Sequence, residues 1–299
     1  MLIAVTGATG FLGSYITKRL SEDGHEQRVL VRKTSDTSLV EALGAETVEG
    51  DMRDLLSLEA LVEGCGCVIH AAVGFAATRG RRQLANFEVN LLGSLRLMDL
   101  ARRGGAQFIF VSTGAVHDKI LDDRPLDEAH PLWPGSTYGA YKAAVEAFLP
   151  AYKEQFGFNG SAYRPTSIYG VHAAKPERSH WWSLVAKVLA GEPVETPHGG
   201  KVVCAEDVAE VVCRAVGREE VAGEVYELTD CHIYDRTVAE FAREAAGTDA
   251  EITGAVGKGP RHMIVCDKAR EAFGVGLDRG HEGVKAYITE LVELVKCKG

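Results

Sequence analysis

The sequence lacks the features that would place it in a membrane or on nucleic acid. No apolar stretch approaches about 18 residues, and the first positive charge is Lys18, so neither a membrane span nor a secretory signal is expected. The formal net charge is −9 and no run of lysine and arginine exceeds three residues, which argues against nucleic acid and anionic membranes as partners. We expect a cytoplasmic protein that binds small molecules.

Cysteine is sparse and irregularly spaced. The seven cysteines are an odd set scattered over 299 residues, which does not fit a disulfide framework. Cys65 and Cys67 stand too close together for the usual spacing of metal ligands, and no nearby cysteine or histidine pair completes a set of four. We therefore expect free thiols and no metal site.

Glycine, in contrast, is concentrated directly after the apolar run 2–5. Gly7, Gly10 and Gly13 lie where a buried strand must turn into a helix. A helix N-terminus has unpaired N–H groups and partial positive charge, so this segment predicts a site for the pyrophosphate of a dinucleotide. A plain strand-to-helix turn is the alternative. The apolar residues at helical spacing after Gly10 favour the cofactor site.

Apolar and amphipathic segments alternate along the first half of the chain. The longest helical patterns cover 86–101 and 138–156. Short apolar runs predict strands at 28–31, 46–48, 68–71 and 108–111. This alternation predicts an α/β fold with a Rossmann-type, doubly wound parallel sheet.

The second half is expected to divide between that sheet and a smaller unit. Segment 166–201 is rich in Pro, Gly, His and Trp, as expected of a pocket cover, whereas regular patterns at 202–204, 206–216 and 225–228 predict a return to the main sheet. We expect two interleaved domains. The dinucleotide-binding domain covers 1–165 and about 202–230, and a smaller C-terminal substrate-binding domain covers 166–201 and 231–299.

The end of the second predicted strand bears on the choice of dinucleotide. A site that prefers NAD usually has Asp or Glu there, but this chain has Arg32 followed by Lys33. A guanidinium binds a 2′-phosphate through a planar set of donors, so NADP is favoured over NAD, unless Arg32 only extends to solvent. Asp51 would accept from the adenine amino group with Met52 against the ring, unless Asp51 only stabilises a turn.

Candidate catalytic groups gather around the second long helical pattern. Tyr138 and Lys142 are four residues apart and share one helix face. An ammonium and a positive nicotinamide ring would lower the pKa of the Tyr138 phenol toward working pH, making it an acid/base. Thr113 could donate a hydrogen bond to the same substrate oxygen. Tyr141 is a competing phenol, but it does not share the helix face of Lys142.

Together these motifs resemble the extended short-chain dehydrogenase/reductase family, in particular its NAD(P)-dependent epimerase/dehydratase group and dihydroflavonol-reductase-like members. The resemblance spans nearly the whole chain and rests on the order and spacing of segments 6–13, 50–52, 68–72, 89–93, 111–113, 138–142, 164–170 and 206–208. It implies that Tyr138 is the catalytic acid/base, that Lys142 binds the nicotinamide ribose and tunes Tyr138, that Thr113 orients the substrate oxygen, and that Asn90 supports a proton relay.

The residue patterns and the resemblance together give a set of expected cofactor contacts at the glycine turn, at the strand ends and at the nicotinamide. These are Gly7, Thr9, Gly10, Phe11, Leu12, Gly13, Arg32, Asp51, Met52, Ala71, Ala72, Tyr138, Lys142 and Pro165. Ala71, Ala72 and Pro165 come from the resemblance. The resemblance further implies a homodimer formed through the helices at 86–101 and 138–156.

Two departures from the family pattern limit the reaction. Gly114 and Ala115 follow Thr113 where family dehydratases have an Asp-Glu pair, so dehydration is not expected. Segment 198–202 stands where sugar-nucleotide epimerases often have an arginine that reaches the diphosphate, which weakens that alternative without excluding it.

We therefore expect an NAD(P)-dependent oxidoreductase that transfers a hydride between nicotinamide and a carbonyl or secondary alcohol of a small molecule. Two alternatives remain open: a nucleotide-sugar epimerase that retains NAD, and a non-catalytic dinucleotide-sensing protein with the same fold. Trp181 and Trp182, next to His180, suggest a flat or apolar substrate, unless they only pack.

Overall fold

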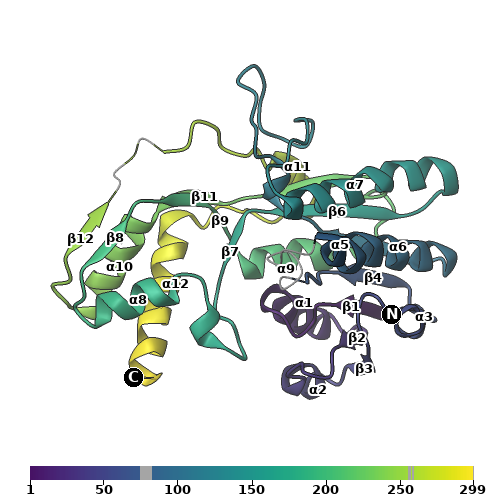
Figure 1. Ribbon diagram of the computed structural model, residues 1–299, viewed down its shortest axis with the longest axis horizontal. Coiled ribbons are helices and arrows are strands. Elements are labelled where there is room, and N and C mark those ends of the chain that lie inside the picture. Colours follow the sequence, from purple (N-terminus) through teal and green to yellow (C-terminus); the bar gives the residue numbers. More distant parts are fainter. Residues whose placement is uncertain (75–82, 255–256, 258, 299) are drawn as a thin grey trace.

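The computed structural model describes residues 1–74, 83–254, 257 and 259–298 (Figure 1). Its centre is a seven-stranded sheet of order β10-β6-β5-β4-β1-β2-β3, in which every pairing is parallel. The strands are β1 (Leu2–Thr6), β2 (Glu26–Val31), β3 (Glu46–Glu49), β4 (Cys67–His70), β5 (Gln107–Val111), β6 (Gly160–Pro165) and β10 (Val225–Leu228). The strand order reverses between β1 and β4, where Rossmann-type sheets bind dinucleotides. The predicted fold class is confirmed.

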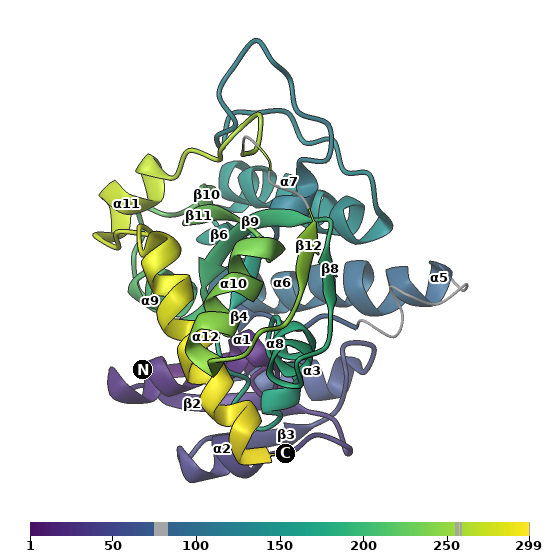
Figure 2. The same cartoon turned by 90° about the vertical axis from the view of Figure 1, so that its left-hand side faces the viewer.

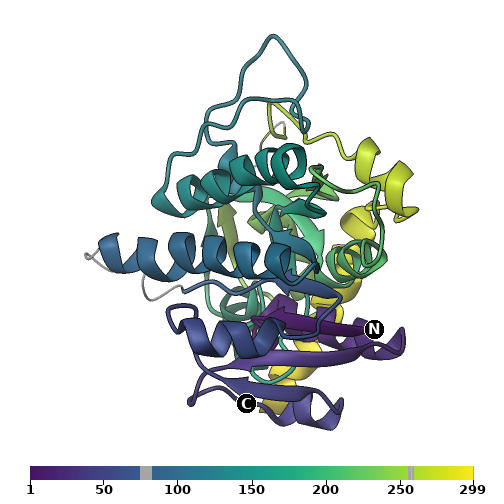
Figure 3. The same ribbon diagram turned by 90° about the vertical axis from the view of Figure 1, so that its right-hand side faces the viewer.

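Helices cover both faces of this sheet. One face carries α1 (Phe11–Glu22), α2 (Ser38–Ala42), α9 (Ala205–Arg214) and α11 (Asp267–Phe273). The other carries α3 (Leu55–Val62), the continuous run of α5 (Gln83–Asn86), the π-helical turn η1 (Phe87–Leu92) and α6 (Gly93–Arg103), and α7 (Thr137–Phe156). Figure 3 shows this run in blue beside α7 in teal. Because both faces are covered, the central strands β4 and β5 are buried along their whole length.

A smaller unit lies beyond the end of the sheet (Figures 1 and 2). It contains a three-stranded sheet of β11 (Cys231–Tyr234), β9 (Gly199–Cys204) and β7 (Ser167–Tyr169), and a parallel pair of β8 (Val194–Thr196) and β12 (Ile252–Gly254). Helices α8 (Trp182–Leu189), α10 (Asp235–Ala246) and α12 (Gly280–Lys298) pack against one another around a separate hydrophobic core. The described residues also form two short 3-10 turns, η2 (Gly114–Val116) and η3 (Pro176–Arg178).

The prediction that 202–204 returns to the main sheet is wrong. This segment ends β9 in the three-stranded sheet, and the chain returns through α9, which packs on α1, and through β10. Val202 and Val203 are both buried, each in a different hydrophobic core, so their apolar pattern matches that of a central parallel strand. α11, expected in the smaller domain, packs on β10. The interleaved division into two domains remains our proposal.

The aromatic cluster at 180–182 packs the smaller unit. The Trp181 ring lies 6.3 Å from the Tyr169 ring and 6.4 Å from the Tyr287 ring, and its Nε1 donates to Asp235 at 2.8 Å. These contacts support the packing alternative. Within the described part of the chain, no helix has the length and apolar character to cross a bilayer. The same residues hold no group of three or more His, Cys, Asp or Glu placed to bind a metal ion.

The turn from β1 into α1 depends on close backbone contacts. Gly7 has a φ of +80°, and a Cβ there would lie 2.8 Å from backbone atoms of Ala71 and Ala72. A Cβ on Gly13 would lie 1.9 Å from the Gly7 carbonyl oxygen, whereas a Cβ on Gly10 would lie 3.1 Å from the same atom. Gly13 therefore lets α1 press against the turn, and Gly10 is less constrained in the absence of ligand.

We expect Gly13→Ala to destabilise the protein by about 2 kcal/mol or more, because the new methyl group forces α1 away from β1. Gly10→Ala is the matched control and should cost well under half as much, since its neighbour must move by only a few tenths of an ångström. Urea unfolding without cofactor measures both. Equal losses of unfolding free energy would contradict the packing argument.

Candidate active site

The catalytic candidates lie where β5 and α7 meet. Thr113 caps η2, its Oγ accepting from the Ala115 N–H at 3.2 Å. The Ser136 Oγ caps α7 by accepting from the Gly139 N–H at 3.1 Å. A Cβ on Gly139 would lie 2.3 Å from the Ala115 carbonyl oxygen, so only glycine lets α7 approach η2 this closely. This approach brings Tyr138, in the first turn of α7, to Thr113.

Tyr138 and Thr113 are joined by a hydrogen bond between their side chains. Burial raises the pKa of Tyr138 above its usual value, and the hydrogen bond from Thr113 offsets part of that rise. The expectation that Lys142 and a bound nicotinamide together lower this pKa stays a prediction. The phenol is therefore protonated at neutral pH and can donate a proton.

Lys142 lies one helical turn beyond Tyr138 and is 1% exposed. Its Nζ donates to the Val111 carbonyl oxygen at 2.5 Å and lies 4.4 Å from the centre of the Phe110 ring. Burial lowers the pKa of Lys142 to about 7, although the charge of Glu146 opposes this. The amine is thus directed at the end of β5, which explains why it does not act on the phenol in this structure.

The competing phenol, Tyr141, is in a different position. It is 2% exposed, and its hydroxyl has no hydrogen-bond partner among the residues that the structure describes. Its ring packs edge-on against the Tyr138 ring at 5.6 Å, and burial raises its pKa. Tyr141 supports the position of Tyr138 by packing.

The turn before α1 fits the pyrophosphate of a dinucleotide. Its N-cap residue, Gly10, has no side chain to accept from the first-turn N–H groups, whereas Asp54 caps α3 and Ser136 caps α7 with side-chain oxygens. Phosphate oxygens satisfy such N–H groups. Thr9 belongs to this same turn, and Phe11 and Leu12 are the first residues of α1. Ala71 and Ala72 face Gly7 from the end of β4.

A second cavity, of about 540 Å³, lies at the ends of β2 and β3. Its lining includes Arg32, Lys33, Thr34, Asp51 and Arg53. The Asp51 carboxylate accepts from the Arg53 side chain at 2.6 and 3.1 Å and from the Arg53 N–H at 2.8 Å, and these bonds lower its pKa. These are the turn contacts of the alternative given above, and they do not test a contact of Asp51 with adenine. Arg32 is exposed beside it.

Met52 is buried in the core on the α6 side of the sheet. A Cβ on Gly93 would lie 2.7 Å from the Met52 carbonyl oxygen and 2.9 Å from its Cβ, so α6 packs directly on this residue. Its contact with adenine stays a prediction, and so does that of Asp51.

Asn90 lies in the π-helical turn η1 and is buried. Its Oδ1 accepts from the Gly74 N–H at 2.7 Å, and its Nδ2 donates to the Asn86 Oδ1 at 2.7 Å. The Asn90 carbonyl oxygen accepts from the Ser94 hydroxyl at 2.5 Å. These contacts use the side chain to hold η1, and the relay role remains a prediction.

A buried polar chain continues from Ser94 to the glycine turn. The Ser94 hydroxyl lies 2.7 Å from the His70 Nε2, and the His70 Nδ1 lies 2.6 Å from the Thr6 Oγ1. Burial lowers the pKa of His70 to about 3, so the ring is neutral. Thr6, directly before Gly7, is thereby connected through the neutral His70 ring to Ser94 and η1.

Sequence reasoning missed a buried ionic cluster beneath Thr113. Arg164, 3% exposed, donates to Glu146 at 2.6 Å and to Glu227 at 2.8 Å. The His117 Nε2 lies 2.7 Å from the same Glu227 oxygen, and Ser112 hydrogen-bonds Glu146. A signal was present, because Arg164 and Glu227 each interrupt an apolar strand.

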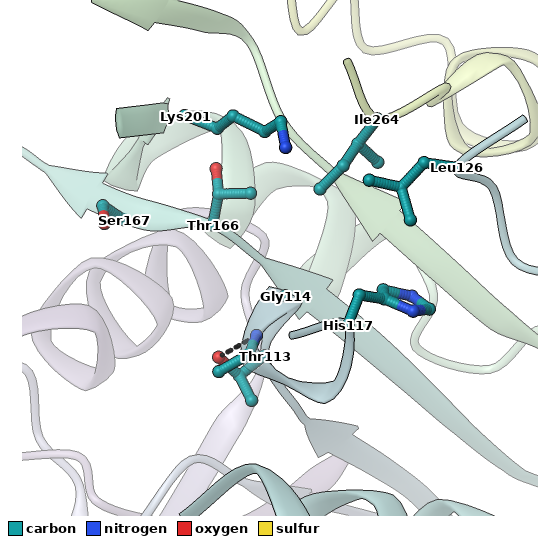
Figure 4. Close-up of a pocket in the computed structure, with 9 residues that line it drawn as sticks. Thr113, Gly114, His117, Leu126, Thr166, Ser167, Lys201 and Ile264 are labelled. Atoms are coloured by element: carbon teal, nitrogen blue, oxygen red, sulfur yellow. Dashed lines mark hydrogen bonds between the residues drawn. The ribbon is translucent and has the colours of Figure 1, made fainter. Parts of the chain in front are cut away.

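A cavity of about 410 Å³ opens between the large sheet and the smaller unit (Figure 4). Thr113 and Gly114 line it from the end of β5, and Thr166, next to Pro165, lines it from the end of β6. The other lining residues are Ala115, His117, Leu126, Ser167, Lys201 and Ile264. The cavity thus joins a candidate catalytic residue to the smaller unit.

The predicted residues therefore fall into three groups. Thr113, Tyr138, Lys142 and Pro165 lie together at the ends of β5, β6 and the start of α7. The glycine turn, with Ala71 and Ala72, lies at the ends of β1 and β4. Arg32 and Asp51 lie farther along the sheet, at the ends of β2 and β3.

Comparison with known proteins gives a consistent result. The model of the NAD dependent epimerase/dehydratase family matches residues 3–229. The sterol demethylase protein B of Methylococcus capsulatus is 28% identical over 83% of this chain and 75% of its own. The 4-hydroxy-2-methyl-3-oxo-4-farnesyl-3,4-dihydroquinoline-1-oxide ketoreductase of Stigmatella aurantiaca is 30% identical over 83% and 74%. The UDP-glucose 4-epimerase of Thermus thermophilus, solved in complex with NAD, is 27% identical, with a TM-score of 0.79 over 97% of this chain and 99% of that one.

The buried amine of Lys142 predicts a pH-dependent stability. Its pKa falls from 10.5 to about 7 on folding, so the unfolded chain binds more protons between these values. The loss of stability caused by burying the charged amine is complete below about pH 7 and disappears as pH rises to about 10.5. We expect Lys142→Met to raise the free energy of unfolding at about pH 7 by on the order of 2 kcal/mol, and the gain to shrink toward pH 10.

Urea unfolding across this pH range measures the effect. Lys153→Met, at an exposed position of the same helix, is the control and should leave the pH dependence unchanged. A difference between Lys142→Met and wild type that stays constant with pH would contradict the assignment.

Proposed function

The chain belongs to the NAD-dependent epimerase/dehydratase family, and on this basis we propose that it is an oxidoreductase acting on a carbonyl or secondary alcohol of a small molecule with NADP(H). It is an enzyme of the extended short-chain dehydrogenase/reductase type, as its relatives are. The observation that carries the proposal is that Thr113, which lines the 410 Å³ cavity, is hydrogen-bonded to the Tyr138 side chain.

In the direction of reduction, Tyr138 donates its proton to the substrate oxygen. Its raised pKa keeps the phenol protonated at neutral pH, which suits a donor. Thr113 donates a hydrogen bond to the same oxygen and holds it at the phenol. A bound nicotinamide supplies or takes up the hydride at C4. Lys142 is the cation nearest to Tyr138 along α7. It would bind the ribose, and its positive charge would stabilise the Tyr138 phenolate.

The residues that follow Thr113 favour reduction over dehydration. Elimination of water needs an acid and a base next to the substrate, and the residues after Thr113 are Gly114 and Ala115. Neither has a group that moves a proton. The name of the Stigmatella aurantiaca relative, a ketoreductase, agrees with carbonyl reduction.

The cation cluster at the ends of β2 and β3 supports NADP. Arg32 and Lys33 line the 540 Å³ cavity, whose carboxylates are Glu49, Asp51 and Asp54. Arg53 holds the Asp51 carboxylate, and Asp54 caps α3. A 2′-phosphate would meet cations there and no free carboxylate on Asp51. The Thermus thermophilus neighbour, by contrast, was solved with NAD.

Epimerisation of a nucleotide sugar with retained NAD is the second candidate. It is favoured by the similarity to UDP-glucose 4-epimerases in sequence and in structure. The cofactor content of the purified protein decides between them: a stoichiometric, tightly held NAD supports epimerisation, whereas cofactor-free protein that oxidises NADPH with a ketone supports reduction.

We expect Tyr138→Phe to lower turnover by about 10²–10⁴-fold while cofactor affinity stays within a few-fold, because only the proton donor is lost. Tyr141→Phe is the matched control. It removes a hydroxyl without a partner among the described residues, so turnover should persist. The assay is NADPH oxidation with a panel of ketones, aldehydes and sugar nucleotides. Full activity of Tyr138→Phe, or no turnover by the wild type alongside firm cofactor binding, would refute catalysis and favour a sensor.

We expect Arg32→Gln to raise KM for NADPH about tenfold or more and to change KM for NADH about twofold at most, because only NADPH carries the 2′-phosphate. Arg103→Gln, at an exposed position at the end of α6, is the control for the change of charge. Similar increases for both cofactors would show that Arg32 does not select NADPH.

A further inference from the structure

Lys201 places a cation in the substrate cavity without an ionic partner. It lies on β9, opposite His232 of β11, and lines the same cavity as Thr113. Among the residues that the structure describes, its ammonium makes no hydrogen bond and no ion pair. Burial lowers the pKa of Lys201 below its usual value, and the charge of Glu227 opposes this. The amine is therefore partly desolvated, and only the charge of Glu227, without a direct contact, compensates it.

Glu227 does not account for this lysine as its ion-pair partner. The Glu227 Oε1 accepts from Arg164 at 2.8 Å and lies 2.7 Å from the His117 Nε2, while its Oε2 is buried without a hydrogen-bond partner among the described residues. It makes no ion pair with Lys201 in the described part of the chain. The Lys201 ammonium therefore feels the charge of Glu227 without a direct ion pair to it, and an anion that enters the cavity would give the ammonium a direct partner.

The neighbouring side chains make this end of the cavity rich in donors. The Thr229 hydroxyl donates to the Thr166 Oγ1 at 2.7 Å, which leaves the Thr166 proton for another acceptor. Figure 4 shows the Lys201 amine extending over Thr166 toward Ile264, with Thr113 across the cavity. Leu126 and Ile264, joined by an isolated β-bridge, supply an apolar wall.

We propose that Lys201 and Thr166 bind an anionic group of the substrate, a carboxylate or a phosphate, while the reacting carbonyl lies at Thr113 and Tyr138. This inference rests on the proposed function, because it defines the substrate class of the same site. An anion compensates the desolvated ammonium through a charge-assisted hydrogen bond. The apolar wall fits the carbon skeleton between the two polar ends.

The test measures binding without turnover. With the protein saturated by NADP⁺, which cannot reduce a ketone, isothermal titration calorimetry compares three probes: 4-oxo-4-phenylbutanoate, its methyl ester and UDP. We expect Lys201→Gln to weaken binding of the acid, of UDP or of both about tenfold or more, and to leave the neutral ester unchanged. The acid represents a carboxylate source and UDP a phosphate source.

Lys187→Gln, an exposed position on α8, makes the same change of charge and should alter none of the affinities. Equal binding of the acid and of UDP by wild type and Lys201→Gln, or no binding of either by wild type, would overturn the proposal. A lower melting temperature of Lys201→Gln with unchanged anion binding would assign the lysine to balancing Glu227 instead. Since no turnover is needed, the proposed reaction can fail in the Tyr138→Phe assay while this site stands.

Discussion

The geometry of the site depends on Arg164 being held between two buried glutamates. Glu146 belongs to α7, Glu227 to β10, and Arg164 to β6, so one guanidinium joins three elements that are far apart in the sequence. Removing one partner of such a cluster leaves an uncompensated buried charge, which is strongly destabilising. Because α7 carries Tyr138 and Lys142, and Glu227 of β10 contacts His117, the cluster sets where these candidate catalytic groups lie relative to the cavity.

In the same region, burial of the Lys142 amine also has an electrostatic cost. Its amine has one hydrogen bond, to Val111, and an aromatic face, at Phe110, in place of water. Glu146, one turn further along α7, favours the charged form but is itself held by Arg164 and Ser112. An apolar residue would fill this space at lower cost, so the presence of a buried amine beside Tyr138 fits a functional role.

Much of the fold follows from the sequence because its strongest signals are local. The glycine turn and the alternating patterns predicted the large parallel sheet, and helical spacing paired Tyr138 with Lys142. β9 was misplaced because Val202 and Val203 are buried on both sides, as in a central strand. The Arg164 cluster and Lys201 were missed for a different reason. Their partners and their cavity come from strands and loops distant in sequence, and spacing does not reveal which of these meet.

The polarity of the cavity also bears on the choice between reduction and epimerisation. Epimerisation requires the transient ketone to present both of its faces to the nicotinamide. A substrate bound by Lys201 and Thr166 at one end and by Thr113 at the other is held at two points within about 410 Å³. Rotation would break one of these attachments, so a short substrate keeps a single face toward the hydride. A long nucleotide sugar, anchored only through its phosphates, would keep that freedom. The length of chain between anion and carbonyl therefore determines which reaction the site favours.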